Sequence, residues 1–240
     1  MGKTIKPPEP FCATPTAEAI IFALRHCHKE GDMGAIVGPP GVGKTTTCRE
    51  YIRHHGSPSS RAHLVTMSPV ETKPFHSLRA VGEEVGEVDL RSSFHIFEQL
   101  KYRLSGGPHL LIIDEAQHLE PKSLDVLRSV HDATGCGIVF TGNERITMQF
   151  KGKRGLFAQF TSRLGLAIQL DPSTEEDVTA FLDHHRITGE MARAALIKLG
   201  TKEGNLRDVG KVIAIARARA REAPIALPDI QFALRVKQID

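Results

Sequence analysis

One stretch of this sequence decides the fold: Met33-Gly34-Ala35-Ile36-Val37, followed at once by Gly38-Pro39-Pro40-Gly41-Val42-Gly43-Lys44-Thr45. The first five residues form an apolar run, which is typical of a buried strand. The next eight have the spacing G-x-x-x-x-G-K-T, in which glycines let backbone N–H groups turn inward around a phosphate. A helical pattern follows from Thr45 to His54. A strand, a glycine-rich loop and a helix in this order predict a nucleotide site.

The residues that end the loop have separate expected roles. Lys44 brings positive charge to the β- and γ-phosphates of ATP, and the hydroxyl of Thr45 ligates Mg²⁺. Thr46 belongs to the same predicted nucleotide-binding segment. The alternative is an ordinary glycine turn with an incidental lysine, and the flanking strand and helix argue against it.

A second apolar strand, residues 110–113, ends in the adjacent acids Asp114 and Glu115. We expect Asp114 to hold magnesium through water and Glu115 to act as the general base on the attacking water. Asn143 follows the next apolar strand, residues 137–140, through Thr141 and Gly142. Its amide is predicted to reach the γ-phosphate or the water, and an ordinary turn asparagine is an equally weighted alternative. Hydrolysis of ATP is the expected reaction.

Strand and helix patterns alternate as far as Asp171. The expected strands are residues 33–37, 62–67, 110–113, 137–140 and 166–170, and the first helix is expected to begin at Thr16 with Thr16 as its cap. Apolar strands that alternate with helices predict an α/β fold with a parallel five-stranded sheet flanked by helices. Only helical patterns follow, at 174–187, 189–200, 205–222 and 227–237. We therefore predict an extended segment at 1–15, an α/β nucleotide-binding domain at 16–171 and a small helical lid at 172–240.

The composition of the 240 residues, 40% hydrophobic and 25% charged, is that of an ordinary globular protein. No apolar run approaches the ~18 residues of a membrane span, and the first residues lack the apolar region of a secretory signal. The four cysteines lie far apart, which favours scattered thiols in a reducing compartment. These features predict a cytoplasmic protein. The net charge of +3 is too small to indicate nucleic-acid binding by itself.

The ordered set of Lys44, Asp114-Glu115, Asn143, Ser162-Arg163 and Gly204-x-x-Arg207 resembles the AAA+ ATPases over about residues 16 to 238. The resemblance implies that Asn143 is the first sensor of the nucleotide and Arg207 the second, from the lid. It also implies that Arg163 is an arginine finger that acts in trans on a neighbouring subunit, so the active species is an oligomer. Arg145 and Arg154 are alternative fingers.

Residues 114–119, 123–132 and 141–144 narrow this likeness to the transposition ATPases, a group that includes the phage Mu B protein, TnsC and the TniB proteins. The related secretion ATPase ExeA shares much of the pattern. The resemblance implies a ring or helical filament on double-stranded DNA, bound without sequence preference. Such an assembly selects target DNA, recruits and stimulates a DDE transposase, and leaves the DNA upon ATP hydrolysis. The Mu B protein carries an added N-terminal helix-turn-helix domain, whereas about fifteen residues precede the ATPase core in this sequence. If this chain is full length, DNA contact is expected from the AAA+ module itself.

Basic and hydroxyl residues in two regions, 73–103 and 151–154, are candidates for contacts with DNA phosphates. Flexible basic loops suit binding that does not read the bases. The candidates are Lys73, Arg91, Ser92, Lys101, Arg103, Lys151, Lys153 and Arg154. Solvated surface charge is the alternative for each of them. A basic stretch in the predicted lid, from Lys211 to Arg221, is a candidate subunit or transposase contact instead.

Three other functions remain open on the sequence. They are an ExeA-like secretion or assembly ATPase, a replication-type loader, and a nucleotide-gated scaffold that does not hydrolyse ATP. No membrane- or wall-binding segment is visible to favour the first. Glu115 argues against the last.

Overall fold

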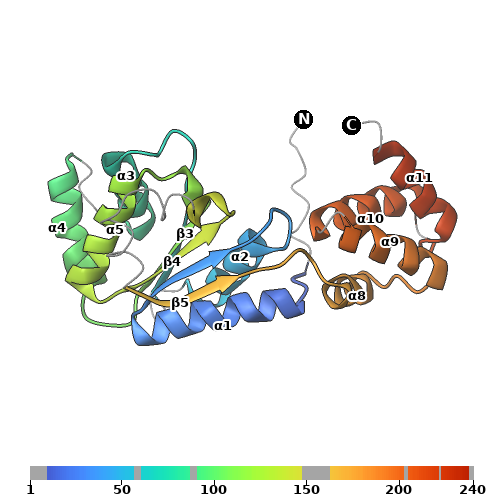
Figure 1. Cartoon of the computed structure of the whole chain (residues 1–240), viewed down its shortest axis with the longest axis horizontal. Helices are drawn as coiled ribbons and strands as arrows, with labels where there is room; N and C mark the ends of the chain where they lie inside the picture. The colour runs from blue at the N-terminus through green and yellow to red at the C-terminus, as the bar shows by residue number, and fades with distance from the viewer. Residues whose placement is uncertain are drawn as a thin grey trace.

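The computed structural model describes residues 10–56, 61–86, 91–147, 163–202, 205–221 and 223–237. The molecule has a parallel sheet with helices on both faces, and a separate group of C-terminal helices beyond the carboxyl end of the sheet (Figure 1). The expected α/β class with a five-stranded parallel sheet is confirmed. No described helix combines the length and the apolar character that crossing a membrane requires.

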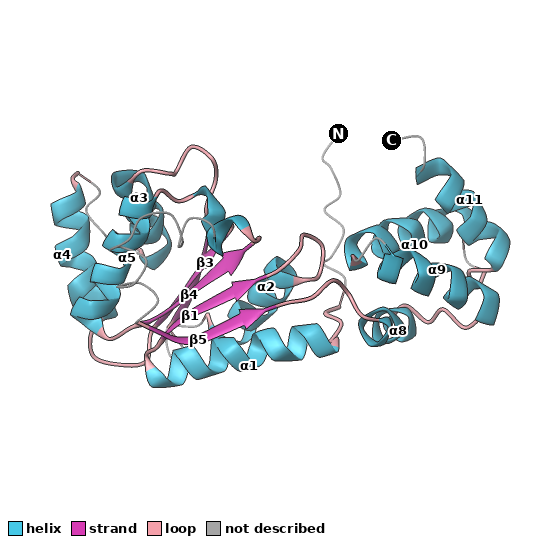
Figure 2. Cartoon of the chain, viewed as in Figure 1, coloured by secondary structure: helices cyan, strands magenta, loops and turns pink. Residues whose placement is uncertain are grey.

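The sheet has the strand order β2-β3-β4-β1-β5. Its strands are β1 (Met33–Val37), β2 (Ala62–Thr66), β3 (Leu110–Asp114), β4 (Gly137–Gly142) and β5 (Leu164–Gln169). Figure 2 shows the strands side by side at the centre of the larger part of the molecule. All neighbours pair in parallel, so the carboxyl ends of β1, β3 and β4 lie along one edge of the sheet.

Four strands differ from their expected limits at this edge, and two of them, β2 and β5, end one residue earlier than predicted. β3 includes Asp114, and β4 runs two residues further than predicted, because Thr141 and Gly142 still pair with Ile36 and Val37 of β1. A polar residue is tolerated in the buried strand because the Thr141 hydroxyl donates a hydrogen bond to the Asp114 carboxylate. β5 begins earlier than expected, at Leu164, which pairs with Met33.

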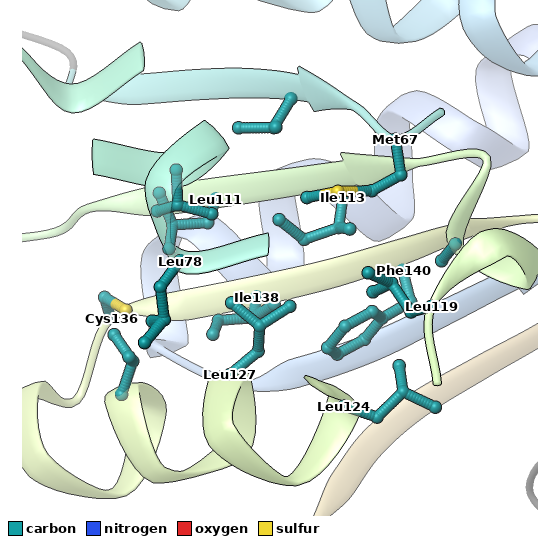
Figure 3. Packing of buried hydrophobic residues seen from close by; sticks show 14 of the residues in the cluster. Met67, Leu78, Leu111, Ile113, Leu119, Leu124, Leu127, Cys136, Ile138 and Phe140 are labelled. Carbon is teal, nitrogen blue, oxygen red and sulfur yellow. The ribbon is translucent and has the colours of Figure 1, made fainter. Parts of the chain in front are cut away.

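The helices of the α/β part cover the two faces of the sheet. They are α1 (Pro15–Glu30), α2 (Lys44–His55), α3 (Pro74–Val85), α4 (Ser93–Leu104), the 3₁₀ helix η1 (Ala116–His118) and α5 (Pro121–Thr134). Leu111 and Ile113 of β3 face α3, α4 and α5, whereas Leu110 and Ile112 face α1 and α2. This alternation follows from the two-residue period of a strand. Figure 3 shows the first of these cores, with Ile138 and Phe140 packed beside Leu124 and Leu127.

The start of α1 differs from the expectation that Thr16 caps it. The helix begins at Pro15, and the hydroxyl of Thr14 accepts a hydrogen bond from the backbone N–H of Ala17. Proline suits the first helical position because it has no N–H to satisfy, which leaves the preceding residue as the cap. Thr16 has another role: its N–H and its hydroxyl donate to the two carboxylate oxygens of Asp177, at 2.9 and 2.7 Å.

Four helices form the C-terminal group, which we call the lid: α8 (Glu175–His184), α9 (Glu190–Lys202), α10 (Leu206–Ala220) and α11 (Leu227–Lys237). Among the described residues, the buried apolar side chains of these helices form a cluster of their own. Asp177, in the first turn of α8, also completes the capping box of that helix. The Thr16–Asp177 pair therefore ties the first helix of the lid to the first helix of the α/β part. The domain limit after Asp171 stays a prediction.

His109 lies just before β3, at the opposite edge of the sheet, and is only 7% exposed. Its ring is parallel to that of His63, and its Nδ1 atom is buried with no hydrogen-bond partner among the described residues. Burial lowers the pKa of His109 from 6.5 to about 4, and the nearby Arg61, His63 and His28 contribute to this decrease. As the pH falls, this histidine is therefore protonated in the unfolded chain before it is protonated in the folded chain. The contribution of His109 to the free energy of unfolding is fully present above pH 6.5 and is lost as the pH falls toward 4.

We predict that this residue makes the free energy of unfolding fall by about 1–2 kcal/mol between pH 7 and pH 5. The substitution His109→Phe retains an aromatic ring against His63 and removes the titrating group, so its stability should depend less on pH. Urea denaturation at pH 7, 6 and 5 measures both slopes. Equal slopes for the two proteins would contradict the assigned pKa.

Candidate nucleotide-binding site

A cavity of about 640 Å³ lies between the carboxyl edge of the sheet and the lid. This volume is within the ~300–1,000 Å³ of small-molecule sites. Most of the residues predicted for nucleotide binding and catalysis line it: Pro40, Gly41, Val42, Gly43, Lys44, Thr45, Thr46, Glu115, Asn143 and Arg207. The parallel sheet explains this gathering, because β1, β3 and β4 all deliver their following loops to the same edge.

The backbone of the loop after β1 requires glycine at three positions for two reasons. Gly41 and Gly43 have φ values of +87° and +103°, in the left-handed region that side chains disfavour. Gly38 lies against Leu170, where an added Cβ would come within 2.6 Å of the Leu170 Cβ. The loop geometry therefore depends on both backbone conformation and close packing.

The start of α2 has the donors that a phosphate requires. The helix begins at Lys44, and no side-chain hydrogen bond caps its first turn. Such an uncapped N-terminus presents N–H groups and the positive end of the helix dipole. The Lys44 side chain is largely buried, and its ammonium donates to the carbonyl oxygens of Gly38 and Pro39, both at 2.8 Å. These donors fit the β- and γ-phosphates of a nucleotide.

Burial is the main cause that lowers the pKa of Lys44, and the nearby positive charge of Arg207 lowers it further. The carboxylates of Glu115 and Asp114 act in the opposite direction. Lys44 is thus close enough to the acidic pair and to the lid arginine for their charges to interact. The structure brings together residues that lie far apart in the sequence.

Asp114 is only 1% exposed and has a hydroxyl donor on each carboxylate oxygen. Oδ2 accepts a hydrogen bond from Thr45 Oγ1 at 2.7 Å, and Oδ1 accepts one from Thr141 Oγ1. The two residues predicted to hold magnesium are therefore in direct contact. A carboxylate beside a hydroxyl at a phosphate loop provides the hard oxygen ligands that Mg²⁺ prefers, so the donor set fits this ion.

Thr141 was not among the residues predicted from the sequence, although a polar residue directly after an apolar run was a usable signal. The pairing could not be read from the sequence because 27 residues separate Thr141 from Asp114.

Glu115 has φ 54° and ψ 36°, a left-handed conformation that is uncommon for a residue other than glycine. Backbone strain of this kind is often found at functional sites. The side chain lines the cavity, and the carboxamide of Gln117 donates a hydrogen bond to it. Gln117 also was not predicted from the sequence as a site residue.

Asn143 was predicted either to contact the nucleotide or to be an ordinary turn asparagine, and its position is compatible with both. Its Oδ1 atom accepts a hydrogen bond from the backbone N–H of Arg145 at 3.0 Å, as in an ordinary asparagine turn. The residue also lines the cavity with Glu115 and Lys44. The turn fixes the oxygen end of the amide and directs the residue to the nucleotide side of the sheet edge.

The lid contacts the phosphate loop directly through the start of α10. The backbone N–H of Leu206 donates to the carbonyl oxygen of Gly41 at 3.1 Å. Asn205, which caps α10, occupies the space where a side chain on residue 41 would lie. Arg207 is the second residue of α10 and faces the same cavity.

Part of the cavity lining was not predicted from the sequence. It includes Phe11 and Cys12 from the segment before α1, and Phe181 and His185 from the end of α8. The Cys12 thiol donates to the carbonyl oxygen of Ala180 at 3.6 Å, so this segment contacts the lid. Flat aromatic surfaces of this kind suit a nucleotide base. The lining thus combines these aromatic rings with the polar phosphate loop and with the charged residues Arg49, Glu50 and Arg53 of α2.

Arg163 is not part of this cavity. It directly precedes Leu164, which pairs with Met33 at the start of β1, whereas the phosphate loop follows the other end of β1. Its side chain is 55% exposed, with Nε 3.7 Å from Asp132 Oδ1. Arg163 thus lies at the opposite edge of the sheet from the Lys44 of its own chain.

The candidate DNA contacts do not gather at one place in the described part of the chain. Arg91 and Ser92 precede α4, and Lys101 and Arg103 lie in its last turn, up to ~18 Å away along a 12-residue helix. The Ser92 hydroxyl caps α4, and Lys101 pairs with Glu98 at 3.0 Å. Lys73 immediately precedes α3. Lys151, Lys153 and Arg154, the last of which is also an alternative finger, lie outside the described residues.

The basic residues of the lid helix α10 make contacts within the lid. Lys211 is 3.6 Å from Asp208, and Arg219 is 3.4 Å from Asp229 and stacks over the Phe232 ring. Lys211 and Arg219, two of the basic residues that were predicted to contact a subunit or the transposase, therefore have acidic partners within the lid. Such a surface stays a prediction.

The two hydroxyls on Asp114 lead to a test of the site. We predict that Thr141→Val, which leaves Oδ1 of the buried carboxylate without this donor, lowers the free energy of unfolding by about 1–3 kcal/mol. Thr141→Ser retains the donor and serves as the matched control, with a smaller loss. Urea denaturation without nucleotide measures both, and a valine variant as stable as the serine variant would show that the contact is dispensable.

Comparison with solved structures gives the same architecture. The ORC2 protein of Aeropyrum pernix, solved in ADPNP–ADP complexes, aligns with a TM-score of 0.72 and 15% identity over 98% of this chain and 70% of its own. Domain III of the Thermotoga maritima replication initiation protein DnaA aligns with a TM-score of 0.62 and 17% identity, over 94% of each chain. At these identities the likeness establishes the fold alone.

Comparison at the level of sequence is more specific. The AAA domain family matches residues 27–150, and the family described as the C-terminal part of the Mu B transposition protein matches residues 162–236. The "ATP-dependent target DNA activator B" of Escherichia phage Mu is 30% identical over 218 residues, which are 89% of this chain and 69% of that protein. The "Mu-like prophage FluMu DNA transposition protein B" of Haemophilus influenzae is 29% identical over 143 residues, which are 59% of this chain and 48% of that protein. Together with the phosphate loop and acidic pair around one cavity, these matches establish that the chain is an AAA ATPase of the phage Mu B transposition protein family.

Proposed function

We propose that this protein is an ATP- and Mg²⁺-dependent activator of target DNA in transposition. In this proposal, ATP-bound subunits assemble on double-stranded DNA without sequence preference, recruit and stimulate a DDE transposase, and leave the DNA after hydrolysis. One observation carries the proposal: a match to the phage Mu target DNA activator spans 89% of the chain. The cavity described above supports the ATP-dependent part of this activity.

Different described residues bind different parts of ATP. The uncapped start of α2 and the Lys44 ammonium bind the β- and γ-phosphates, and Arg207 approaches them from the lid. The aromatic part of the lining, with Phe11 and Phe181, takes the base. Thr45 and Asp114 hold the magnesium ion, which when bound neutralises phosphate charge and orients the phosphates for displacement.

Hydrolysis in this arrangement needs a base and a sensor on the γ-phosphate. Glu115 accepts a proton from the water while the water oxygen attacks the γ-phosphorus. The bond between the γ-phosphorus and the oxygen that bridges it to the β-phosphate breaks, which gives ADP and phosphate. Asn143 has its side-chain oxygen in the turn with Arg145, so its amide nitrogen is the end that can donate to the γ-phosphate or the water. Both residues line the cavity.

The position of Arg163 supports assembly into an oligomer. The five residues of β1 span ~16 Å between the edge that bears Arg163 and the edge that bears the phosphate loop. An arginine side chain is too short to cover that distance, so Arg163 can act as a finger only on the nucleotide of another subunit. ATP would then join neighbouring subunits, and loss of the γ-phosphate would weaken the contact.

Two observations support DNA binding. One is the similarity to the target DNA activator of phage Mu, and the other is the basic segment from Arg145 to Arg163, which contains no acidic residue. Contacts to phosphate alone would give an affinity that falls steeply with salt. The fold likeness to ORC2 and DnaA does not distinguish a replication-type loader from a transposition protein, whereas the Mu B relatives favour transposition.

The first test uses Glu115→Gln, which removes the base and retains the shape of the side chain. We predict that the variant binds ATP, loses hydrolysis by at least about 100-fold and remains assembled on DNA. Electron microscopy and anisotropy on random duplex DNA, with ATP, ADP or a non-hydrolysable analogue, measure assembly and binding. Wild-type protein should assemble with ATP and release with ADP. No affinity for duplex at low salt would reject the DNA part and leave the ATPase intact.

The second test mixes two inactive variants. Lys44→Ala lacks a functional phosphate loop but retains the finger, and Arg163→Ala retains the phosphate loop but lacks the finger. We predict that each is inactive alone and that an equal mixture regains about a quarter of the wild-type rate, because one interface in four combines an intact site with an intact finger. Asp132→Asn, which retains Arg163 and alters the carboxylate that contacts both Arg163 and Arg128, is the control. A mixture that stays inactive would contradict action in trans.

A further inference from the structure

The carboxamide of Gln117 joins two parts of the site. Gln117 is the central residue of η1, the short helix that follows the acidic pair. Its Nε2 atom donates to Oε2 of Glu115, and its Oε1 atom accepts a hydrogen bond from the backbone N–H of Asn143 at 3.3 Å. One end of a single amide group therefore binds the proposed base, and the other end binds the residue that follows β4.

The space for this amide exists because residue 142 is a glycine. A Cβ atom on Gly142 would collide with Oε1 of Gln117 and would lie 2.6 Å from Cδ1 of Ile146. The φ angle of Gly142 is outside the left-handed region, so its backbone conformation does not require glycine. Packing against Gln117 and Ile146 accounts for the glycine instead.

The bond to Gln117 constrains the Glu115 carboxylate. Glu115 follows a buried strand through a left-handed turn, and its flexible side chain lines the open cavity. A donor on Oε2 restrains the orientation of the carboxylate and leaves Oε1 to accept a proton from water. Placement of a base matters because a shift of ~1 Å in a reacting group can cost about 100-fold in rate.

We propose that Gln117 is a positioning residue that links the Asn143 loop to Glu115. A movement of the Asn143 backbone, such as a contact between the Asn143 amide and the γ-phosphate would cause, shifts the Gln117 carboxamide and with it the Glu115 carboxylate. The base is thereby aligned when the loop is in its phosphate-bound position. This inference rests on the proposed role of Glu115 as the base.

Three variants test the two hydrogen bonds of Gln117, to Glu115 and to Asn143. Gln117→Glu retains an oxygen for the Asn143 N–H but replaces the donor to Glu115 by a second carboxylate. Gln117→Met removes both hydrogen bonds. Gly142→Ala leaves every hydrogen-bonding group in place and displaces the carboxamide, at little cost in stability because the colliding atoms are the ends of flexible side chains.

We expect each variant to lower kcat by about 10- to 100-fold while the KM for ATP changes by less than about threefold, because the lost interaction acts in the hydrolytic step. Steady-state ATPase assays and ATP titrations give the two constants. Gln231→Glu, at an exposed position of α11, and Gly189→Ala, where the nearest atom is 3.6 Å from the added Cβ, are matched controls. Both should retain wild-type rates.

The pH dependence distinguishes positioning from a general loss of structure. The carboxyl group introduced by Gln117→Glu has an O–H group when it is protonated, and it can then donate to Glu115 again. The rate of this variant relative to wild type should therefore rise as the pH falls. Combination of Gln117→Met with Glu115→Gln should add no further loss, since the positioned group is already absent.

The two hypotheses fail in different ways. If Glu115→Gln hydrolyses ATP at the wild-type rate, the base assignment fails, and the role of Gln117 fails with it. If Glu115→Gln is inactive but Gln117→Glu and Gly142→Ala have wild-type kcat, only the link through Gln117 is rejected. A KM raised as much as kcat is lowered would also reject it, in favour of a role in ATP binding.

Discussion

Asp114 stands at the end of a central strand with its carboxylate almost fully buried, and a charge in that position is tolerated only with close hydrogen-bond donors. The donors come from two other segments, Thr45 at the start of α2 and Thr141 near the end of β4. The same carboxylate therefore fixes the start of the phosphate-loop helix relative to two strands of the sheet. The arrangement proposed for catalysis depends on this contact, because Glu115 and Asn143 follow directly from the strands that it joins.

Within the described residues, hydrogen bonds attach the lid to the segment before α1, to the start of α1 and to the phosphate loop. The Thr16–Asp177 hydrogen bonds connect the starts of α1 and α8, and the hydrogen bond from Leu206 to Gly41 connects α10 with the phosphate loop. The described lid helices share a buried apolar cluster of their own, so most of their packing is internal to the lid. Because Arg207 and the Gly41 contact lie on the same turn of α10, phosphate binding and lid position are expected to depend on each other. In the proposed assembly, such a link would offer a path from the nucleotide to the contacts between subunits.

Much of the fold followed from the sequence because its signals are local. Apolar strands that alternate with helices predicted the parallel sheet, and the five predicted strands all occur within a few residues of their expected limits. The errors lie at the ends of elements, where tertiary contacts decide. β4 continues through Thr141 because Asp114 accepts its hydroxyl, and α1 is capped by Thr14 because Pro15 takes the first helical position. The candidate site was predicted in the same way, through residues that carry a recognisable spacing around Lys44 and Asp114.

What the sequence determined by itself was the set of chemical groups and the local backbone: the glycines and lysine of the phosphate loop, the acidic pair at a strand end, and the helical character of the lid. Tertiary structure alone decided which of these groups meet. The strand order β2-β3-β4-β1-β5 sets Asp114 beside Thr141, the turn after β3 brings Gln117 against Gly142, and the lid sets Asn205 against Gly41. The physical reason is that spacing and periodicity encode conformations over a few residues, whereas these pairs depend on how distant strands and helices pack.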